Sequence, residues 1–159
     1  MAVTGFSFEL ESPVNAARIF KAAVLDSQSV MPKAMPQVVS SASLLQGDGG
    51  VGSVKQFKFT EIVPLSHVNQ RIDVLDETNL EYKYTVTEGS YLGTKVTSAL
   101  YHIKIEPSAG GSICKASAEY ETTEEVELTE EEINIGKDGL LGTIKAVEAF
   151  LLANPDAYA

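Results

Sequence analysis

The sequence predicts an α+β fold in which a curved antiparallel sheet of seven strands wraps around a long C-terminal helix. Six consecutive segments between residues 37 and 122 are short, rich in β-branched or aromatic residues, and separated by turn signals. A strand and two short helices are expected before them, and one long helical pattern follows them. Short connections between successive strands favour an antiparallel meander, and a helix laid against a curved sheet buries the apolar faces of both.

The first three expected elements are one strand and two short helices. The strand covers residues 3–11, where the apolar side chains of FSFEL alternate with polar ones, as in a half-buried strand. The segment AARIFKAAVL then places apolar residues at helical spacing, which predicts a short amphipathic helix ending at about Leu25. Residues 26–33 predict a second short helix, which Pro32 and Pro36 are expected to end.

The remaining elements are six strands and one helix. Turn residues at 47–50, 64, 76–79, 89–93 and 107–111 divide the strands, which are expected over residues 37–46, 53–61, 65–75, 80–88, 95–105 and 112–122. The helix is expected over residues 130–153, because Thr129 and Glu132 form a capping-box pattern at its start and Asn154-Pro155 ends it.

The loop GDGGVGS at residues 47–53 has two interpretations. Consecutive backbone N–H groups in such a loop can cradle an anion. However, the Gly-Lys-Ser/Thr ending and the following helix of a nucleotide-binding loop are missing, and a strand follows instead. A tight connection between strands that needs positive φ angles is therefore favoured.

Composition limits the classes of function. The 159 residues fit one domain, residues 1–159, and the 12 basic and 22 acidic residues give a formal charge of -10. This charge opposes binding to nucleic acid or to anionic membranes. Cys114 has no internal disulfide partner, and no signal segment is evident, so we expect a cytoplasmic protein. A monomer is also expected. His67, His102 and Cys114 do not match a zinc-binding spacing, and no metal or cofactor is expected.

Three features favour a hollow interior, and each has an ordinary alternative. The long helix carries three glycines, which leave room for a ligand or else serve close packing of the helix on the sheet. Tyr82, Tyr84 and Tyr101 place phenols on the expected inward face, where a ligand or water can satisfy the hydroxyl groups; ordinary core tyrosines are the alternative. The inward candidates on the sheet are a mixture of large and very small side chains, which leave a void unless neighbouring large side chains fill the space. They are Phe57, Phe59, Ile103, Cys114, Ala116 and Ala118.

Four stretches carry a resemblance to a known family: ARIFKAAVLDSQSVMPKAMPQVVSSASLLQGDGGVGSVKQFKF, TNLEYKYTVTEG, GGSICKASAEY and AVEAFLLANPDAYA. Together they resemble plant pathogenesis-related class 10 proteins and the birch major pollen allergen, in order and over nearly the whole chain. The resemblance implies a helix-grip fold, in which seven strands hold the long helix, two short helices close one end, and a large internal cavity lies between. It also implies binding of flavonoids, cytokinins, steroids or similar amphiphiles, and a link to defence or stress.

The resemblance and the alternation pattern together give a set of expected ligand-binding residues. Lys55 and Lys137 resemble family positions near the cavity, although a solvated surface charge is the alternative for each. His67 falls where relatives carry an inward aromatic residue, and an exposed or hydrogen-bonded histidine is its alternative. The full set is Lys55, Phe57, Phe59, His67, Tyr82, Tyr84, Tyr101, Cys114, Lys137, Gly139, Leu140 and Ile144.

The expected function is to bind and carry or store a small hydrophobic plant ligand, with no catalytic residue assigned. One enzymatic alternative is the ribonuclease activity credited to some members, but only Glu148 of its three residues is kept, since Phe150 and Thr97 replace the other two. Another is condensation of an amine with an aldehyde, for which Lys55 and Lys137 are the plausible interior amines. Hormone sensing is a third, although the gate and latch signatures of hormone receptors are not evident.

Overall fold

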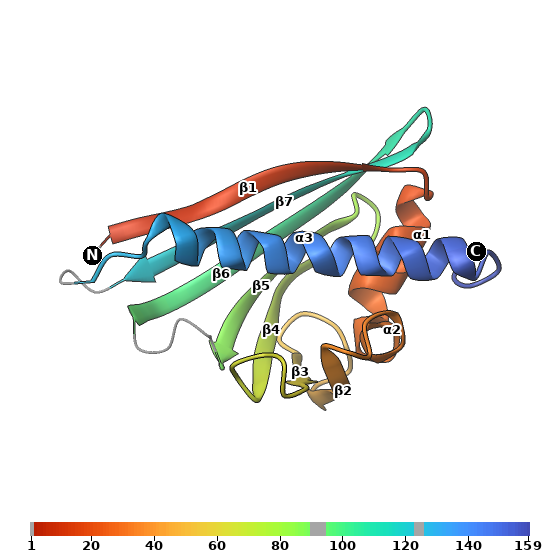
Figure 1. Ribbon diagram of the computed structural model, residues 1–159. Helices are drawn as coiled ribbons and strands as arrows, with labels where there is room; N and C mark the ends of the chain where they lie inside the picture. The colour runs from red at the N-terminus through yellow and green to blue at the C-terminus, as the bar shows by residue number, and fades with distance from the viewer. Residues whose placement is uncertain (1, 90–94, 123–125) are drawn as a thin grey trace.

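The computed structural model describes residues 2–89, 95–122 and 126–159. Its elements follow the expected order of a strand, short helices, six strands and a long helix (Figure 1). The strands are β1 (Ala2–Ser12), β2 (Val39–Gln46), β3 (Val54–Phe59), β4 (His67–Asp76), β5 (Glu81–Glu88), β6 (Val96–Ser108) and β7 (Gly111–Thr122). The helical elements are α1 (Ala16–Phe20), the π-helical turn η1 (Lys21–Leu25), α2 (Ser27–Ala34) and α3 (Glu130–Ala153).

All seven strands form one antiparallel sheet in the order β1-β7-β6-β5-β4-β3-β2. Five of the neighbours are consecutive hairpin partners, and β1 joins the sheet beside β7. The β2–β3, β4–β5 and β6–β7 pairs contain register shifts, such as the one between Ile72 and Val74 in β4, and such bulges bend and twist a sheet. The sheet curves past one side of α3 (Figure 1), so the predicted curved seven-stranded sheet is confirmed.

The region between β1 and β2 differs in detail from the prediction. The first helix changes at Lys21 into the π-helical turn η1, and Asn15 caps its start by accepting hydrogen bonds from the backbone of Ala17 and Arg18. The prediction that Pro32 helps to end the second helix is wrong, because α2 continues through it to Ala34. Proline removes a single backbone donor there, and the next turn still closes through the bond from Met35 N to Met31 O.

The hairpin between β6 and β7 is tighter than predicted. Residues 107–111 were expected to form the turn, but β6 extends to Ser108 and β7 begins at Gly111. Pro107 is therefore a strand residue opposite Ser112, at the end of the hairpin, where the missing N–H group disturbs little of the ladder. The predicted turn at 89–93 lies mostly outside the described residues.

The glycine-rich loop joins β2 to β3, as the favoured interpretation predicted. Gly47, Gly49 and Gly52 all have positive φ angles, between 86° and 102°. Side chains rarely adopt this region, so glycine is required for the path of the chain. The loop is closed by the Ser53 hydroxyl, which accepts a hydrogen bond from the backbone N–H of Gly49 at 2.9 Å.

Helix α3 begins and ends at the predicted residues. The capping box is present, since the Thr129 hydroxyl accepts from the Glu132 backbone and the Glu132 carboxylate accepts from the Thr129 backbone, each at 3.1 Å. Gly139 and Gly142 are exposed, and an added Cβ atom at either would meet no atom within 4 Å. Close packing of α3 on the sheet therefore does not require glycine at these two positions.

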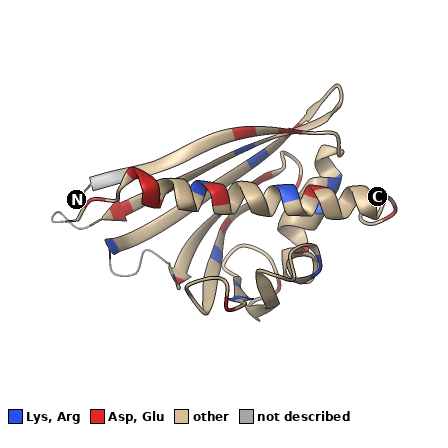
Figure 2. Cartoon of the chain, viewed as in Figure 1, with Lys and Arg blue, Asp and Glu red and all other residues tan. Residues whose placement is uncertain are grey.

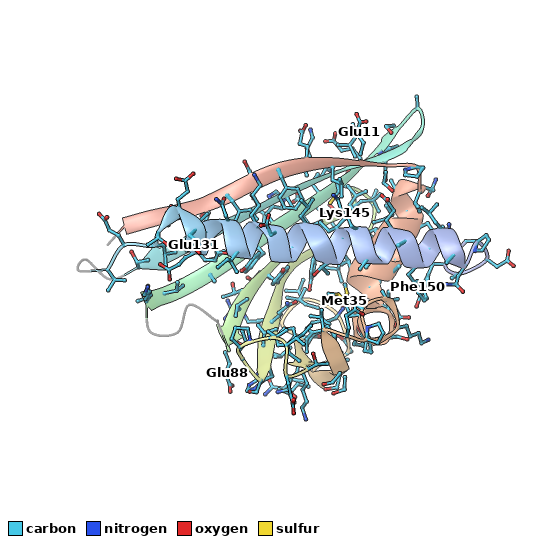
Figure 3. The ribbon with its side chains drawn as sticks, in the orientation of Figure 1. Glu11, Met35, Glu88, Glu131, Lys145 and Phe150 are labelled. Atoms are coloured by element: carbon cyan, nitrogen blue, oxygen red, sulfur yellow. The ribbon has the colours of Figure 1, made fainter. Side chains whose placement is uncertain are left out.

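The buried core lies between the concave side of the sheet and α3, and continues between α2 and the C-terminal half of α3. Helix α3 contributes Ile144, Val147 and Leu151 to it. Met35, directly after α2, fills the region where α2 approaches α3 (Figure 3). Charged residues of both signs are spread along α3 and the strands, with acidic residues gathered at the start of α3 (Figure 2).

Candidate functional site

A row of aromatic side chains crosses the inward face of the sheet. Tyr82 and Tyr84 are two residues apart on β5, so both side chains point to the same side. Tyr84 is paired with Tyr101 on β6, and their rings stack with centroids 4.9 Å apart and planes 7° apart. The row continues to Tyr120 on β7, whose ring meets Tyr101 edge-on at 6.1 Å, and to Phe6 on β1. We call Tyr82, Tyr84, Tyr101, Tyr120 and Phe6 the aromatic row.

The hydroxyl groups of the aromatic row fall into two kinds. Those of Tyr101 and Tyr120 lie 3.1 Å apart and hydrogen-bond to each other. Tyr82 and Tyr84 are only 4% and 6% exposed, and neither hydroxyl group hydrogen-bonds to a described residue, although neither oxygen is completely enclosed by protein. Burial raises the pKa of both phenols well above the usual value, so they are neutral at physiological pH and keep a proton to donate.

Small side chains lie between the large ones in this face. Ala118 on β7 is flanked in register by Tyr101 and Phe6, and Ala116 is flanked by Ile103 and Phe8. Cys114 follows in the same row of β7 and is buried, and its burial raises the pKa of the thiol to about 11. A thiol of this kind is protonated and unreactive, so Cys114 acts here as a small apolar residue.

Lys55 is the most unusual residue of the interior. Its side chain points inward from β3, and the residue is 2% exposed. The ammonium group donates to the carbonyl oxygen of Val24 at 2.6 Å and to the hydroxyl oxygen of Ser27 at 2.8 Å. Burial lowers the pKa of Lys55 to about 8, an effect that the nearby charge of Asp26 partly offsets. The structure therefore anchors Lys55 at the junction of η1 and α2.

His67 lies on the other side of the sheet from the aromatic row. It is paired with the exposed Lys58 of β3, whereas the adjacent Val68 is paired with the buried Phe57. Its Nε2 atom lies 3.0 Å from Glu88 Oε1, and its Nδ1 atom lies 2.9 Å from the hydroxyl of Ser66. The expectation of an inward histidine is thus wrong, because the register of β3 and β4 turns Val68 inward instead.

The other expected residues divide between the sheet and α3. Phe57 and Phe59 share the inward face of β3 with Lys55. On α3, Ile144 is buried in the core and Leu140 packs against it, while Lys137 is half-buried and Gly139 is exposed. The structure therefore brings Lys55, Phe57, Leu140 and Ile144 to the same interior as the tyrosines, and leaves His67 and Gly139 outside it.

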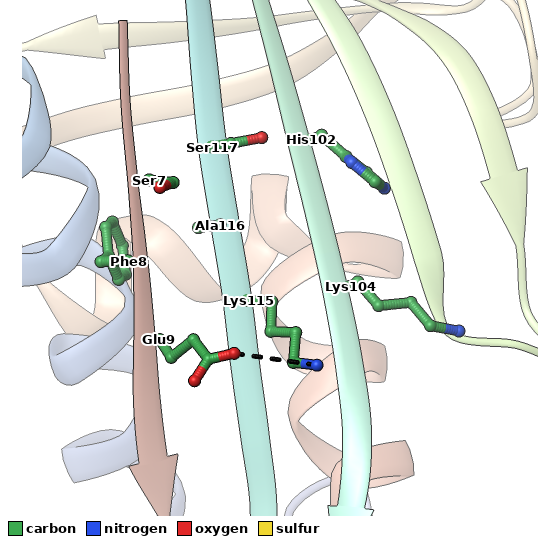
Figure 4. A pocket seen from close by; sticks show the side chains of 8 residues that line it. All are labelled: Ser7, Phe8, Glu9, His102, Lys104, Lys115, Ala116 and Ser117. Carbon is green, nitrogen blue, oxygen red and sulfur yellow. Dashed lines mark ion pairs between the residues drawn. The ribbon is translucent and has the colours of Figure 1, made fainter.

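An open depression of about 490 Å³ lies on the outer face of β1, β7 and β6 (Figure 4). Within this depression, Lys115 pairs with Glu9 at 3.7 Å, and it also pairs with Glu106 at 3.3 Å. Its lining residues are Ser7, Phe8, Glu9, His102, Lys104, Lys115, Ala116 and Ser117.

Sequence reasoning missed two parts of the interior. Tyr120 and Phe6 complete the aromatic row. The period-two alternation of β7 could have identified Tyr120 as an inward residue, whereas Phe6 lies on the apolar face that the alternation predicts for β1 but was not assigned to the site. The partners of Lys55 could not be identified in this way. Val24 and Ser27 are about 30 residues away in the chain and meet Lys55 only through the packing of η1 and α2 against β3.

Comparison with known proteins establishes the family. The model of the pathogenesis-related protein Bet v 1 family matches residues 1–154. The chain belongs to this family. Among curated relatives, the major allergen Pru ar 1 of Prunus armeniaca is 41% identical over 99% of both chains. The probable intracellular pathogenesis-related protein T1 of Catharanthus roseus is 41% identical over 98% of this chain and 99% of its own. Membership of the family supports a defence-related protein that binds ligands.

Solved structures of other proteins share the fold. The crystal structure of Ara h 8.0201 superposes with a TM-score of 0.86 at 33% identity, covering 96% of this chain and all of the other. Norcoclaurine synthase from Thalictrum flavum superposes with a TM-score of 0.73 at 22% identity, covering 95% and 87%, which shows the likeness of fold alone. None of the helices that the structure describes is long and apolar enough to cross a membrane.

Proposed function

We propose that this protein binds a small hydrophobic plant metabolite in a space between the aromatic row and α3, and carries or stores it in the cytoplasm during defence or stress. The observation that supports the proposal most strongly is the pair of buried phenols without a protein partner. The side chains of Tyr82 and Tyr84 are almost completely buried, yet their hydroxyl oxygens are not fully enclosed, so each borders space in which a guest or water can hydrogen-bond to it.

The chemistry of the neighbouring residues suits an aromatic guest with polar groups at its edge. The stacked rings of Tyr84 and Tyr101 offer a flat apolar surface, and Leu140 and Ile144 of α3 offer aliphatic contacts. Ala116 and Ala118 have small side chains, so the inward face of the sheet projects little into the interior beside the tyrosines. Binding would thus gain free energy from apolar burial, while the phenols select guests that can accept or donate hydrogen bonds.

A carrier needs no catalytic group, and the ribonuclease alternative finds little support. Thr97, which stands at the position of one glutamate of the ribonuclease trio, is exposed, and its hydroxyl donates to the backbone of Glu121 at 3.1 Å. The cytoplasmic location and the monomeric state remain parts of the proposal. The name of the Catharanthus roseus relative, an intracellular protein, supports the location.

Calorimetric titration with the flavonoid naringenin tests the proposal. Replacing Tyr82 or Tyr84 with phenylalanine removes only a hydroxyl group, and we expect a loss of affinity of about fivefold to tenfold for at least one variant. The matched control is Tyr158→Phe, which removes the hydroxyl of a tyrosine outside the aromatic row. If wild-type protein binds no naringenin and also fails to bind the broader probe anilinonaphthalene sulfonate, the proposed function is wrong.

A further inference from the structure

The segment after α3, residues 154–159, is tied to the short helices at one end of the molecule. Arg18 of α1 donates from Nε to the carbonyl of Ala157 at 2.8 Å, and from Nη2 to those of Leu151 at 2.8 Å and Asn154 at 2.7 Å. The last carbonyls of a helix lack donors within the helix and carry partial negative charge. One guanidinium group of α1 therefore supplies hydrogen-bond donors to backbone carbonyl groups at the end of α3 and in the residues that follow it.

A second contact joins the same segment to the junction of η1 and α2. The Tyr158 hydroxyl donates to the carboxylate of Asp26, the residue between these two elements. Burial and this hydrogen bond raise the pKa of Tyr158 to about 12. Tyr158 also has a φ angle of 58°, in the left-handed region that a non-glycine residue adopts only at a cost in free energy. The contacts of Tyr158 hold the backbone in this conformation.

The turn around Asp26 is contacted on its outer side by Tyr158 and on its inner side by Lys55. Lys55 donates to Val24 and Ser27, and Asp26 lies between those two residues. The elements involved are short, with five residues in α1, five in η1 and eight in α2. Helices of this length are not stable alone, so their closed position depends on such tertiary contacts.

We propose that residues 154–159 form a strap that holds α1, η1 and α2 closed against α3, and that release of the strap opens this end of the protein for ligand entry and exit. In Figure 1 the C-terminus lies at the end of α3 beside α1 and α2. Opening there would uncover the inner surface of α2 and the end of Lys55. The role in ligand exchange rests on the proposed function, whereas the closing of the helices does not.

Amide hydrogen exchange of the ligand-free protein tests the strap directly. In Tyr158→Phe, which removes one hydrogen bond to a carboxylate, we expect exchange at residues 21–34 to rise about tenfold, with β6 and β7 unchanged. A chain ending at Ala153 should show a larger rise over the same residues. The matched control is Asp156→Asn, a change at an exposed strap residue, which should exchange as wild type does.

Stopped-flow mixing with anilinonaphthalene sulfonate tests the consequence for ligands. Both the association and the dissociation rate should rise in Tyr158→Phe, by a similar factor, so that the affinity changes little. The strap is refuted if the truncated chain and Tyr158→Phe exchange at residues 21–34 as wild type does, or if exchange rises equally in β6 and β7. Failure of wild-type protein to bind the probe would instead count against the proposed function, while the exchange data still decide the strap.

Discussion

The buried ammonium group of Lys55 gives a prediction whose sign and size follow from the structure. The pKa of Lys55 falls from 10.5 to about 8 on folding because the side chain leaves water, and no carboxylate of a described residue forms an ion pair with it. The unfolded chain therefore binds this proton more tightly than the folded protein does. Below pH 8 the group destabilises the fold, and this penalty disappears as the pH rises from about 8 to 10.5.

The magnitude comes from the difference between the two pKa values, which corresponds to about 3 kcal/mol. Lys55→Met removes the titrating group. The free energy of unfolding of the wild-type protein minus that of the variant should therefore rise by about 3 kcal/mol between pH 7 and pH 10.5. Urea unfolding at several pH values measures both proteins, and other titrating groups cancel in the difference. Lys58→Met, an exposed position on the same strand, is the control and should give a constant difference. A constant difference for Lys55→Met as well, or a change in favour of the variant, would refute the reasoning.

Three further predictions concern glycine and cysteine. Gly142→Ala should raise the free energy of unfolding by up to about 1 kcal/mol, because the residue is exposed in a helix and the added Cβ meets no atom; a lower melting temperature would show that glycine is needed there. Gly5→Ala should lower the melting temperature strongly, because the Cβ would lie 1.8 Å from the Ala118 carbonyl oxygen, whereas Gly110→Ala, with open space around it, should not. Cys114 should react with a disulfide reagent far more slowly in native protein than in urea, since burial raises the pKa of its thiol to about 11; equal rates would contradict its burial.

The fold was predictable because local signals and the overall order agree. Turn residues separated the strands, the Thr129–Glu132 pair marked the start of α3, and the alternation around Tyr82 and Tyr84 identified the inward face of β5. The errors arose where a local rule competes with packing. Pro32 stays inside α2 because one missing donor is tolerated, and Pro107 stays inside β6 because it lies at the end of the hairpin.

The candidate site was less predictable because it depends on register and on distant contacts. His67 and Val68 compete for the inward face of β4, and only the pairing with Lys58 and Phe57 decides between them. The sequence shows a lysine at position 55, but the carbonyl of Val24 and the hydroxyl of Ser27 reach it only after η1 and α2 pack against β3. The π-helical form of η1 has no pattern in the sequence that distinguishes it from the α-helix that we expected.

The central claim is that a guest occupies the interior in contact with the two unpartnered phenols. Nuclear magnetic resonance of protein labelled in its tyrosine rings, titrated with anilinonaphthalene sulfonate, measures this contact residue by residue. We expect the ring signals of Tyr82 and Tyr84 to shift and to saturate together at one guest per chain. The account is contradicted if these signals stay fixed while residues around His102 and Lys115, on the outer face, shift instead.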